Sequence, residues 1–256
     1  MVIDAKERLL NQRDELTPPR ILRVLIGDGD YKSAGDEFFK YFVELGNLKP
    51  NEKVLDVGCG VGRMARPLTQ YLNKSGSYDG FDILAQGIDW ASKHITTRHS
   101  NFHFRHADLY NKRYNPEGKL KASEFSFPYP DESFDFVFLT SVFTHMLPKE
   151  LEHYLSEISR VMNKNGRCLT TYFLLNDESV SLIEAKQSSF DFQHKSPEGY
   201  RIIDPNEPEH AVAYEEKYIR SVYQRNELSI KEPIRYGSWC GRKSFLSFQD
   251  IVVANK

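Results

Sequence analysis

A glycine-rich turn directly after a short apolar stretch constrains this chain more than any other feature. Residues 53–63 read KVLDVGCGVGR, in which Val54, Leu55 and Val57 suit a buried strand of a parallel sheet. Three glycines then follow at every second position, so the backbone can turn tightly and approach a ligand closely. An amphipathic helix is expected from Arg63 onward, with its N-terminal amides facing the same space. The segment predicts a pocket for a nucleotide-type ligand.

The spacing of the glycines narrows the choice of ligand. A dinucleotide fingerprint has the spacing GxGxxG, whereas this turn has GxGxG with an acid two residues before the first glycine. At this point the sequence resembles the class I S-adenosylmethionine-dependent methyltransferases, whose first motif is (D/E)xGxGxG. The resemblance implies S-adenosylmethionine as cofactor and S-adenosylhomocysteine as product. The cofactor-binding residues that it implies in this turn are Asp56, Gly58, Gly60 and Gly62.

Two further segments resemble later motifs of the family. Residues 78–83, YDGFDI, form a short strand ending in an acid, and the resemblance assigns Asp82 to the ribose and Ile83 to the adenine face. The alternative is that Asp82 caps a helix starting near Ala85. Residues 102–111 alternate as in a strand, and the resemblance places Asp108 and Leu109 at the adenine amino group and ring nitrogen. Alone, an Asp at a strand end is an ordinary turn residue.

The segment at 127–146 predicts a central strand followed by substrate-side residues. A nearly continuous apolar run at 134–139 fits a buried strand, and the resemblance places Thr140 near the methionine portion of the cofactor. His145 follows within a helical turn of Ser141 and is the candidate general base if the acceptor is a hydroxyl. The alternative is that His145 hydrogen-bonds a loop or packs beside Met146.

The resemblance covers most of the chain from residue 45 and implies an α/β fold. We expect a Rossmann-like, doubly wound, seven-stranded sheet, mostly parallel with an antiparallel last strand, plus N-terminal helices and an insertion in the C-terminal half. The expected domains are a helical cap at 1–46 and a methyltransferase domain at 47–256, with a substrate-pocket insertion at about 176–227. Periodicity predicts further helices at 2–16, 20–26, 34–45, 148–162, 179–186 and 210–225, and strands at 167–175, 190–193, 200–203, 228–236 and 245–254.

The insertion and a late loop carry possible substrate contacts. Six aromatic residues of the insertion either line an apolar small-molecule site or form the core of the insertion itself. They are Phe190, Phe192, Tyr200, Tyr214, Tyr218 and Tyr223. The loop that contains Tyr236, Trp239 and Arg242 suggests positioning of an anion or a planar group, with simple surface exposure as the alternative.

Composition excludes some classes of partner. The formal net charge of −2 and the lack of a basic cluster argue against nucleic acid, and no apolar run is long enough to span a bilayer. The N-terminal residues lack the apolar core of a signal peptide, and the three cysteines lack metal-ligand spacing. We therefore expect a soluble, cytoplasmic protein with reduced thiols, no metal site and a small-molecule substrate.

Two other functional classes stay open beside methyl transfer, for which oxygen is the favoured acceptor atom. One is a nicotinamide-dependent oxidoreductase on a similar sheet, which the glycine spacing and Asp56 oppose. The other is a binding module that keeps the cofactor without chemistry. Residues 140–143 read TSVF in place of the (D/N)PP(Y/F) motif of adenine and amide N-methyltransferases, which argues against DNA bases as acceptors. Thr140 also replaces the carboxylate expected of a divalent-metal catechol-type site.

Overall fold

The computed structural model describes residues 13–27 and 29–256, and these fall into two compact units, one ending at Asp108 and one beginning at Leu109. The expected helix at 2–16 falls largely outside the described residues, and its last four residues, 13–16, are not helical. The expected short helix at 20–26 is confirmed as α2 (Arg20–Arg23) followed by the 3-10 turn η1 (Val24–Ile26).

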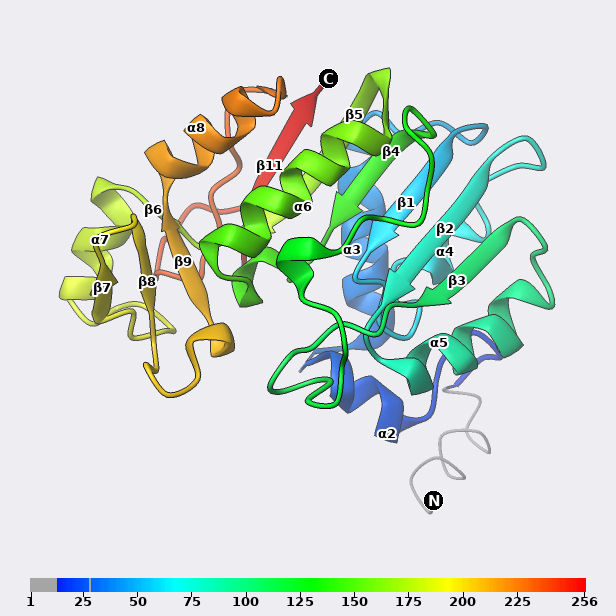
Figure 1. Cartoon of the computed structure of the whole chain (residues 1–256), viewed down its shortest axis with the longest axis horizontal. Helices are drawn as coiled ribbons and strands as arrows, with labels where there is room; N and C mark the ends of the chain where they lie inside the picture. Colours follow the sequence, from blue (N-terminus) through cyan, green and yellow to red (C-terminus); the bar gives the residue numbers. More distant parts are fainter. Residues whose placement is uncertain (1–12, 28) are drawn as a thin grey trace. The chain divides into compact units, whose positions relative to one another are not determined.

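The first unit is built on three parallel strands, which Figure 1 shows side by side: β1 (Lys53–Val57), β2 (Ser77–Asp82) and β3 (Phe102–His106). Val54, Leu55 and Val57 are fully buried, as expected of a central parallel strand. The helices of this unit are α3 (Tyr31–Glu44), α4 (Ala65–Leu68) and α5 (Ala85–Ala91), which a π-helical turn (Ser92–Thr96) extends.

The helix after the glycine turn begins later than expected and is a single turn long. We expected it from Arg63, whereas α4 starts at Ala65 and the preceding residues 60–64 lie in turns. Gly60 and Gly62 have φ values of 55° and 78°, which right-handed helix does not admit. The approach to the expected ligand space is therefore made by turn backbone rather than by a helix N-terminus.

The second unit holds strands of two sheets. The strands β4 (Phe134–Leu139) and β5 (Met162–Tyr172) are parallel, and β11 (Asp250–Asn255) runs antiparallel to β5 and to β10 (Ser229–Ile230). The smaller sheet has the order β6 (Leu174–Leu175), β9 (Val212–Glu215), β8 (Tyr200–Ile202) and β7 (His194–Ser196). The helices are α6 (Pro148–Val161), α7 (Asp177–Glu184) and α8 (Glu216–Arg225), with 3-10 turns η3 (Ala122–Glu124), η4 (Phe143–His145) and η5 (Pro208–His210).

The strand order of the larger sheet is β10-β11-β5-β4-β1-β2-β3. It has seven strands, and β11 is the strand that runs against its neighbours. The expected fold class, a mostly parallel seven-stranded Rossmann-like sheet with an antiparallel last strand, is confirmed. The proposed domain boundaries at 46 and at about 176–227 stay predictions.

Several expected boundaries in the second unit are wrong. The helix before β5 ends at Val161, and the strand runs through Asn165-Gly166, because a register shift opposite Phe134 and Phe136 absorbs the extra residues. Residues 210–225 are not one helix: β9 comes first, since it pairs with β6 and β8, and α8 follows. Residues 190–193 form no strand, and the last strand starts at Asp250 rather than at residue 245.

Helix α6 shows how periodicity sets the core of this unit. Its expected inward face, Leu151, Tyr154, Leu155, Ile158 and Val161, is at most 2% exposed. Its outward face is polar, so the helix is fixed by burial of one stripe. None of the helices within residues 13–27 and 29–256 is long and apolar enough to cross a membrane.

Leu155→Ala should lower the free energy of unfolding by about 2–5 kcal/mol, because it leaves a cavity beneath a fully buried side chain. The exposed neighbour provides the control: Ser156→Ala should stay within about 0.5 kcal/mol of the parent. Urea denaturation followed by circular dichroism measures both variants. Equal midpoints for the two would show that the face of α6 has been misassigned.

Candidate cofactor site

The glycine turn is fixed against the end of β2 by backbone hydrogen bonds. The N–H groups of Gly58 and Cys59 both donate to the carbonyl oxygen of Phe81, at 2.9 and 3.1 Å. Gly58, with φ 87°, and Gly60 adopt the left-handed region that favours glycine. A Cβ on Gly60 would lie 2.7 Å from Cγ2 of Ile26, so the turn has no room for a side chain there.

Asp56 lies at the base of this turn with one oxygen in use. Its side chain is fully buried, and the hydroxyl of Tyr78 donates to Oδ2 at 2.6 Å. Oδ1 has no hydrogen-bond partner among the described residues. Burial raises the pKa of Asp56 to about 8; the charge of Asp82 adds to this, while Tyr78 and Arg63 oppose it. Such an orphaned oxygen is a ready acceptor for a ligand donor.

Asp82 holds the turn as well as the start of the next helix. Its Oδ2 accepts the N–H of Gly60 at 2.7 Å, and its Oδ1 accepts the N–H of Leu84 at 2.8 Å. Burial raises the pKa of Asp82, and the N–H groups of Leu84 and Gly60 act against that rise. The capping alternative is wrong in its strict form, because the N-cap residue of α5 is Leu84 and no side chain caps the helix; Asp82 instead accepts the N–H of Leu84 itself. Ile83 lies beside it, half-buried.

The remaining cofactor candidates follow strand ends, as expected. Asp108 is half-buried two residues after β3, and Leu109 after it is buried. Within the first unit, Asp82 is hydrogen-bonded to the glycine turn and Asp56 to Tyr78, whereas Leu109, Thr140 and His145 belong to the second unit.

The end of β4 carries a feature that the sequence did not signal. Ser141, directly after Thr140, has a φ of 59°, a conformation that costs a residue other than glycine about 1–3 kcal/mol. Its N–H donates to Oγ1 of Thr171 at 2.8 Å, and its hydroxyl donates to Oε1 of Gln249 at 3.1 Å. These bonds hold the strained turn, which lies where ligands bind in sheets of this kind.

His145 lies in the 3-10 turn η4 beyond β4. Its Nδ1 is 3.0 Å from the carbonyl oxygen of Glu209, so the expected loop hydrogen bond is present. A carbonyl only accepts, and we therefore assign the proton to Nδ1 and the lone pair to Nε2. Burial lowers the pKa of His145, and the charge of Arg113 lowers it further. The imidazole is thus kept neutral.

The aromatic residues of residues 176–227 are mostly structural. Phe192 belongs to a buried cluster that also contains Phe173, Ile183 and Trp239, and Phe190 packs against it. Tyr214 and Tyr223 are fully buried elsewhere in the unit. The finding favours the core interpretation over an aromatic small-molecule site.

The late loop is also buried in part. Trp239 is fully buried and Arg242 is only 8% exposed, so the surface-exposure alternative is wrong for these two residues. The three cysteines, Cys59, Cys168 and Cys240, are buried free thiols.

Comparison with known proteins gives one family match and several relatives. Residues 55–170 match the family model described as "Methyltransferase domain". Phosphoethanolamine N-methyltransferase 3 of Arabidopsis thaliana is 29% identical over 185 residues, which cover 70% of this chain and 34% of the relative. A sterol 24-C-methyltransferase of Gibberella zeae is 32% identical over 123 residues, 46% of this chain and 27% of the relative. The chain thus spans about a third or less of the length of these curated relatives.

A solved structure agrees with the fold. An S-adenosylmethionine-dependent methyltransferase from Methanosarcina mazei superposes with a TM-score of 0.56 at 23% identity, covering 83% of this chain and 96% of that one. The matched residues 55–170 contain the glycine turn, the acid ending β2 and the end of β4. This match over residues 55–170, the sheet order and the motif spacing together support a class I S-adenosylmethionine-dependent methyltransferase.

Proposed function

We propose that the protein transfers a methyl group from S-adenosylmethionine to a small-molecule acceptor, and that the methylated atom is an oxygen. The observation that carries the first part is the glycine turn after Asp56, which has no room for side chains at Gly60 and Gly62, together with the Asp56 carboxyl, one oxygen of which has no hydrogen-bond partner among the described residues. The second part is supported by His145, an imidazole whose neutral form is favoured by burial and whose Nδ1 is bonded to the carbonyl of Glu209.

The residues present fit the cofactor in chemical kind. S-adenosylmethionine carries an ammonium group, a sulfonium and a ribose diol, which suit carboxylate acceptors and a turn free of side chains. Asp56 would accept from the cationic end, and Asp82 with Ile83 would hold the ribose and adenine. Asp108, Leu109 and Thr140 complete the proposed set, with Gly58, Gly60 and Gly62 as the cradle. When bound, the cofactor supplies an electrophilic methyl carbon on sulfur.

The protein contributes alignment and one proton acceptor. Holding a nucleophile in line with the methyl carbon lowers the barrier without further chemistry. A hydroxyl must also lose its proton as it attacks, and Nε2 of His145 would take it while Nδ1 stays bonded to the carbonyl of Glu209. The lowered pKa of His145 keeps Nε2 unprotonated below the ordinary imidazole range.

An amine acceptor is the second candidate, because the Arabidopsis relative is described as acting on the nitrogen of phosphoethanolamine. The deciding experiment is a panel of small hydroxyl and amine compounds, assayed by formation of S-adenosylhomocysteine. Turnover on hydroxyl compounds alone supports oxygen transfer, and turnover on amines alone replaces it with nitrogen transfer. No turnover on any compound, with the cofactor bound, would favour a non-catalytic binding module.

Asp82→Ala should weaken S-adenosylhomocysteine binding about tenfold or more, since it removes a charged acceptor and the tie to Gly60. Isothermal titration calorimetry measures the dissociation constant. Asp89→Ala, an exposed acid on α5, is the matched control and should bind like the parent. If both variants bind equally well, Asp82 has no part in the site.

Binding of S-adenosylhomocysteine should strengthen as pH rises from about 6 towards 8. The pKa of Asp56 is raised to about 8, so its carboxyl is mostly protonated below that pH in the protein without ligand. The ammonium of the ligand favours the deprotonated carboxylate. Binding therefore releases a proton, and affinity rises by at most about one log unit per pH unit. Calorimetry at several pH values, in two buffers of different ionisation enthalpy, counts the protons.

Tyr78→Phe extends this pH test to the hydrogen bond that opposes the rise in the pKa of Asp56. Without the hydroxyl, the pKa of Asp56 rises and the affinity increase moves to higher pH. Tyr71→Phe is the control, because the hydroxyl of Tyr71 donates to the carbonyl of Leu48 instead. An affinity independent of pH in the parent would contradict the role given to Asp56.

His145→Gln should reduce kcat by about 10²–10⁴ on a hydroxyl acceptor found by the panel, with cofactor affinity unchanged. His153→Gln is the control, since the imidazole of His153 contacts the carbonyl of Phe125 on another part of the unit. The parent should keep its rate down to a pH below the ordinary pKa of histidine, about 6.5. Full turnover in His145→Gln would remove it as the base.

A further inference from the structure

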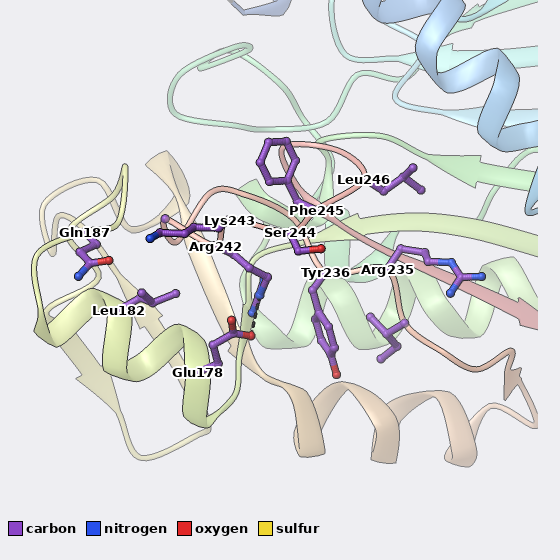
Figure 2. A pocket seen from close by; sticks show the side chains of 12 residues that line it. Glu178, Leu182, Gln187, Arg235, Tyr236, Arg242, Lys243, Ser244, Phe245 and Leu246 are labelled. Atoms are coloured by element: carbon purple, nitrogen blue, oxygen red, sulfur yellow. Dashed lines mark hydrogen bonds and ion pairs between the residues drawn. The ribbon is translucent and has the colours of Figure 1, made fainter.

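A pocket of about 700 Å³ lies in the second unit, between α7 and the loop that precedes β11. Figure 2 shows its lining, in which polar and apolar side chains are mixed. Its polar members include Arg242, Lys243 and Gln187, and its apolar members include Leu182, Tyr236 and Phe245. A concave site with a few polar groups on an apolar lining is typical of small-molecule pockets.

Arg242 is the buried cation of this pocket, and its guanidinium is incompletely paired. Nε donates to Oε2 of Glu178 at 2.7 Å, and Nη1 donates to the carbonyl of Gly237 at 2.8 Å. The guanidinium carbon also lies 4.9 Å from the ring centre of Tyr236. Nη2 is buried and has no hydrogen-bond partner in the part of the chain that the structure describes. A buried donor without an acceptor is rare unless a ligand or water supplies one.

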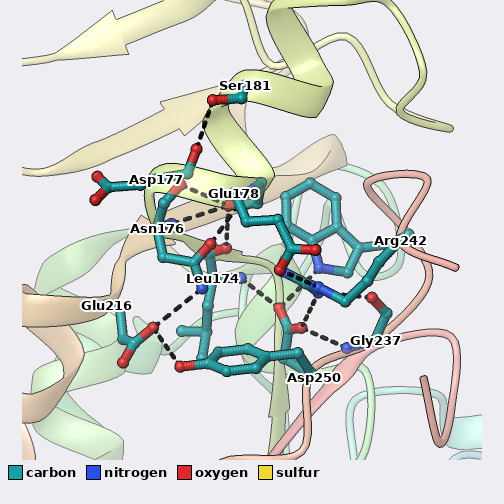
Figure 3. A network of polar contacts seen from close by, with 12 residues as sticks. Leu174, Asn176, Asp177, Glu178, Ser181, Glu216, Gly237, Arg242 and Asp250 are labelled. Atoms are coloured by element: carbon teal, nitrogen blue, oxygen red, sulfur yellow. Dashed lines mark hydrogen bonds and ion pairs between the residues drawn. The ribbon is translucent and has the colours of Figure 1, made fainter. Parts of the chain in front are cut away.

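The position of Arg242 is fixed by a network around a buried carboxyl, drawn in Figure 3. Asp250, fully buried, accepts the N–H groups of Leu174 and Gly237, both at 2.6 Å, and the indole N–H of Trp239 at 2.7 Å. Nη1 of Arg242 lies 3.5 Å from Oδ1 of the same carboxyl. The guanidinium is therefore held before any ligand arrives, which lowers the entropic cost of binding.

The charge of the lining favours an anion. It contains three cationic side chains, Arg235, Arg242 and Lys243, and a single carboxylate, that of Glu178. That carboxylate is already paired with Arg242, and its side chain is 57% exposed. Lys243 is exposed and sits next to Arg242 in the chain. Guanidinium and ammonium groups both suit carboxylate and phosphate oxygens.

The pocket also lies near the carboxyl end of the parallel strands of its own unit. Asp250 opens β11 opposite Tyr172, the last residue of β5. The preceding residue, Gln249, accepts a hydrogen bond from the hydroxyl of Ser141, which follows the end of β4. Ligands of open α/β sheets bind outside the carboxyl ends of the strands. The loop that carries Arg242 is thus anchored at the edge where an acceptor is expected.

We propose that this pocket binds the anionic group of the methyl acceptor, a carboxylate or a phosphate, with Arg242 and Lys243 as its cationic partners. The identification of the ligand as the acceptor rests on the proposed function, whereas anion binding at Arg242 does not. Tyr236 and Phe245 provide the apolar surface for the rest of that molecule.

Trp239 provides a direct spectroscopic reporter of anion binding. The chain has two tryptophans, and the indole N–H of Trp239 shares the carboxyl of Asp250 with Arg242. The indole resonances of the ¹⁵N-labelled protein are followed while inorganic phosphate or acetate is added, against sodium chloride of equal ionic strength. We expect a saturable shift of the Trp239 signal and none of Trp90, which lies in the first unit.

Three variants of exposed charges give opposite expectations. Lys243→Gln should weaken anion binding about tenfold, and Glu178→Gln should strengthen it because a competing carboxylate is removed. Lys195→Gln, an exposed cation on β7 outside the pocket, should leave it unchanged. Arg242→Lys keeps the charge but removes the planar guanidinium, and it should also weaken anion binding. The circular dichroism spectrum of this variant checks that it folds.

The two anions distinguish the two possible anionic groups of the acceptor. Stronger binding of phosphate indicates a phosphorylated acceptor, and stronger binding of acetate indicates a carboxylic acid. A Trp239 signal that responds no more than it does to sodium chloride overturns the proposal. A shift unchanged in Lys243→Gln and Arg242→Lys overturns it as well. Failure of S-adenosylhomocysteine to bind, with the anion shift intact, would instead contradict the proposed function and leave the anion site standing.

Discussion

The two hydrogen bonds from the N–H groups of Gly58 and Cys59 to the carbonyl of Phe81 are the constraint on which the first unit depends. They join the end of β1 to the end of β2 and force the chain into a left-handed turn that glycine adopts at least cost. Asp82, one residue beyond Phe81, then reaches the N–H of Gly60. The glycine turn and Asp82 thus fix each other's positions, so the candidate cofactor site is preformed without a ligand.

In the second unit, the corresponding constraint is the buried carboxyl of Asp250, which accepts hydrogen bonds from three surrounding N–H groups. Asp250 joins the start of β11, the N–H of Leu174 in β6 and the loop of Trp239. Burial raises its pKa to about 6, although three N–H donors and Arg242 oppose the rise. Both units thus contain a carboxyl buried against its own solvation cost. Among the described residues, Oδ1 of Asp56 has no hydrogen-bond partner, and neither has Nη2 of Arg242, the residue next to Asp250.

The parts of the fold that sequence predicted well are those that rest on short-range pattern. The face of α6 follows from spacing alone, and the glycine turn and the acid ending β2 follow from motif residues within thirty positions of one another. The errors arose where pairing is long-range. The segment containing β9 reads as helix because its partner β6 lies far away in sequence. Sequence does not decide between ligand positioning and surface exposure for Arg242, because its partners, Glu178 and Asp250, are brought to it only by tertiary structure. The left-handed Ser141 has no signature in its residue type.

Cys59 lies within the turn, between Gly58 and Gly60, and its thiol is buried. Burial raises the pKa of this thiol well above its usual range, and the charges of Asp56 and Asp82 raise it further. Thiolates are the nucleophilic form of cysteine, and a neutral thiol attacks electrophilic carbon poorly. A protein that holds an alkylating reagent beside its own sulfur risks modifying itself. For a cofactor bound at this turn as proposed, the same low-polarity surroundings that bury Asp56 favour the protonated sulfur and so oppose its alkylation.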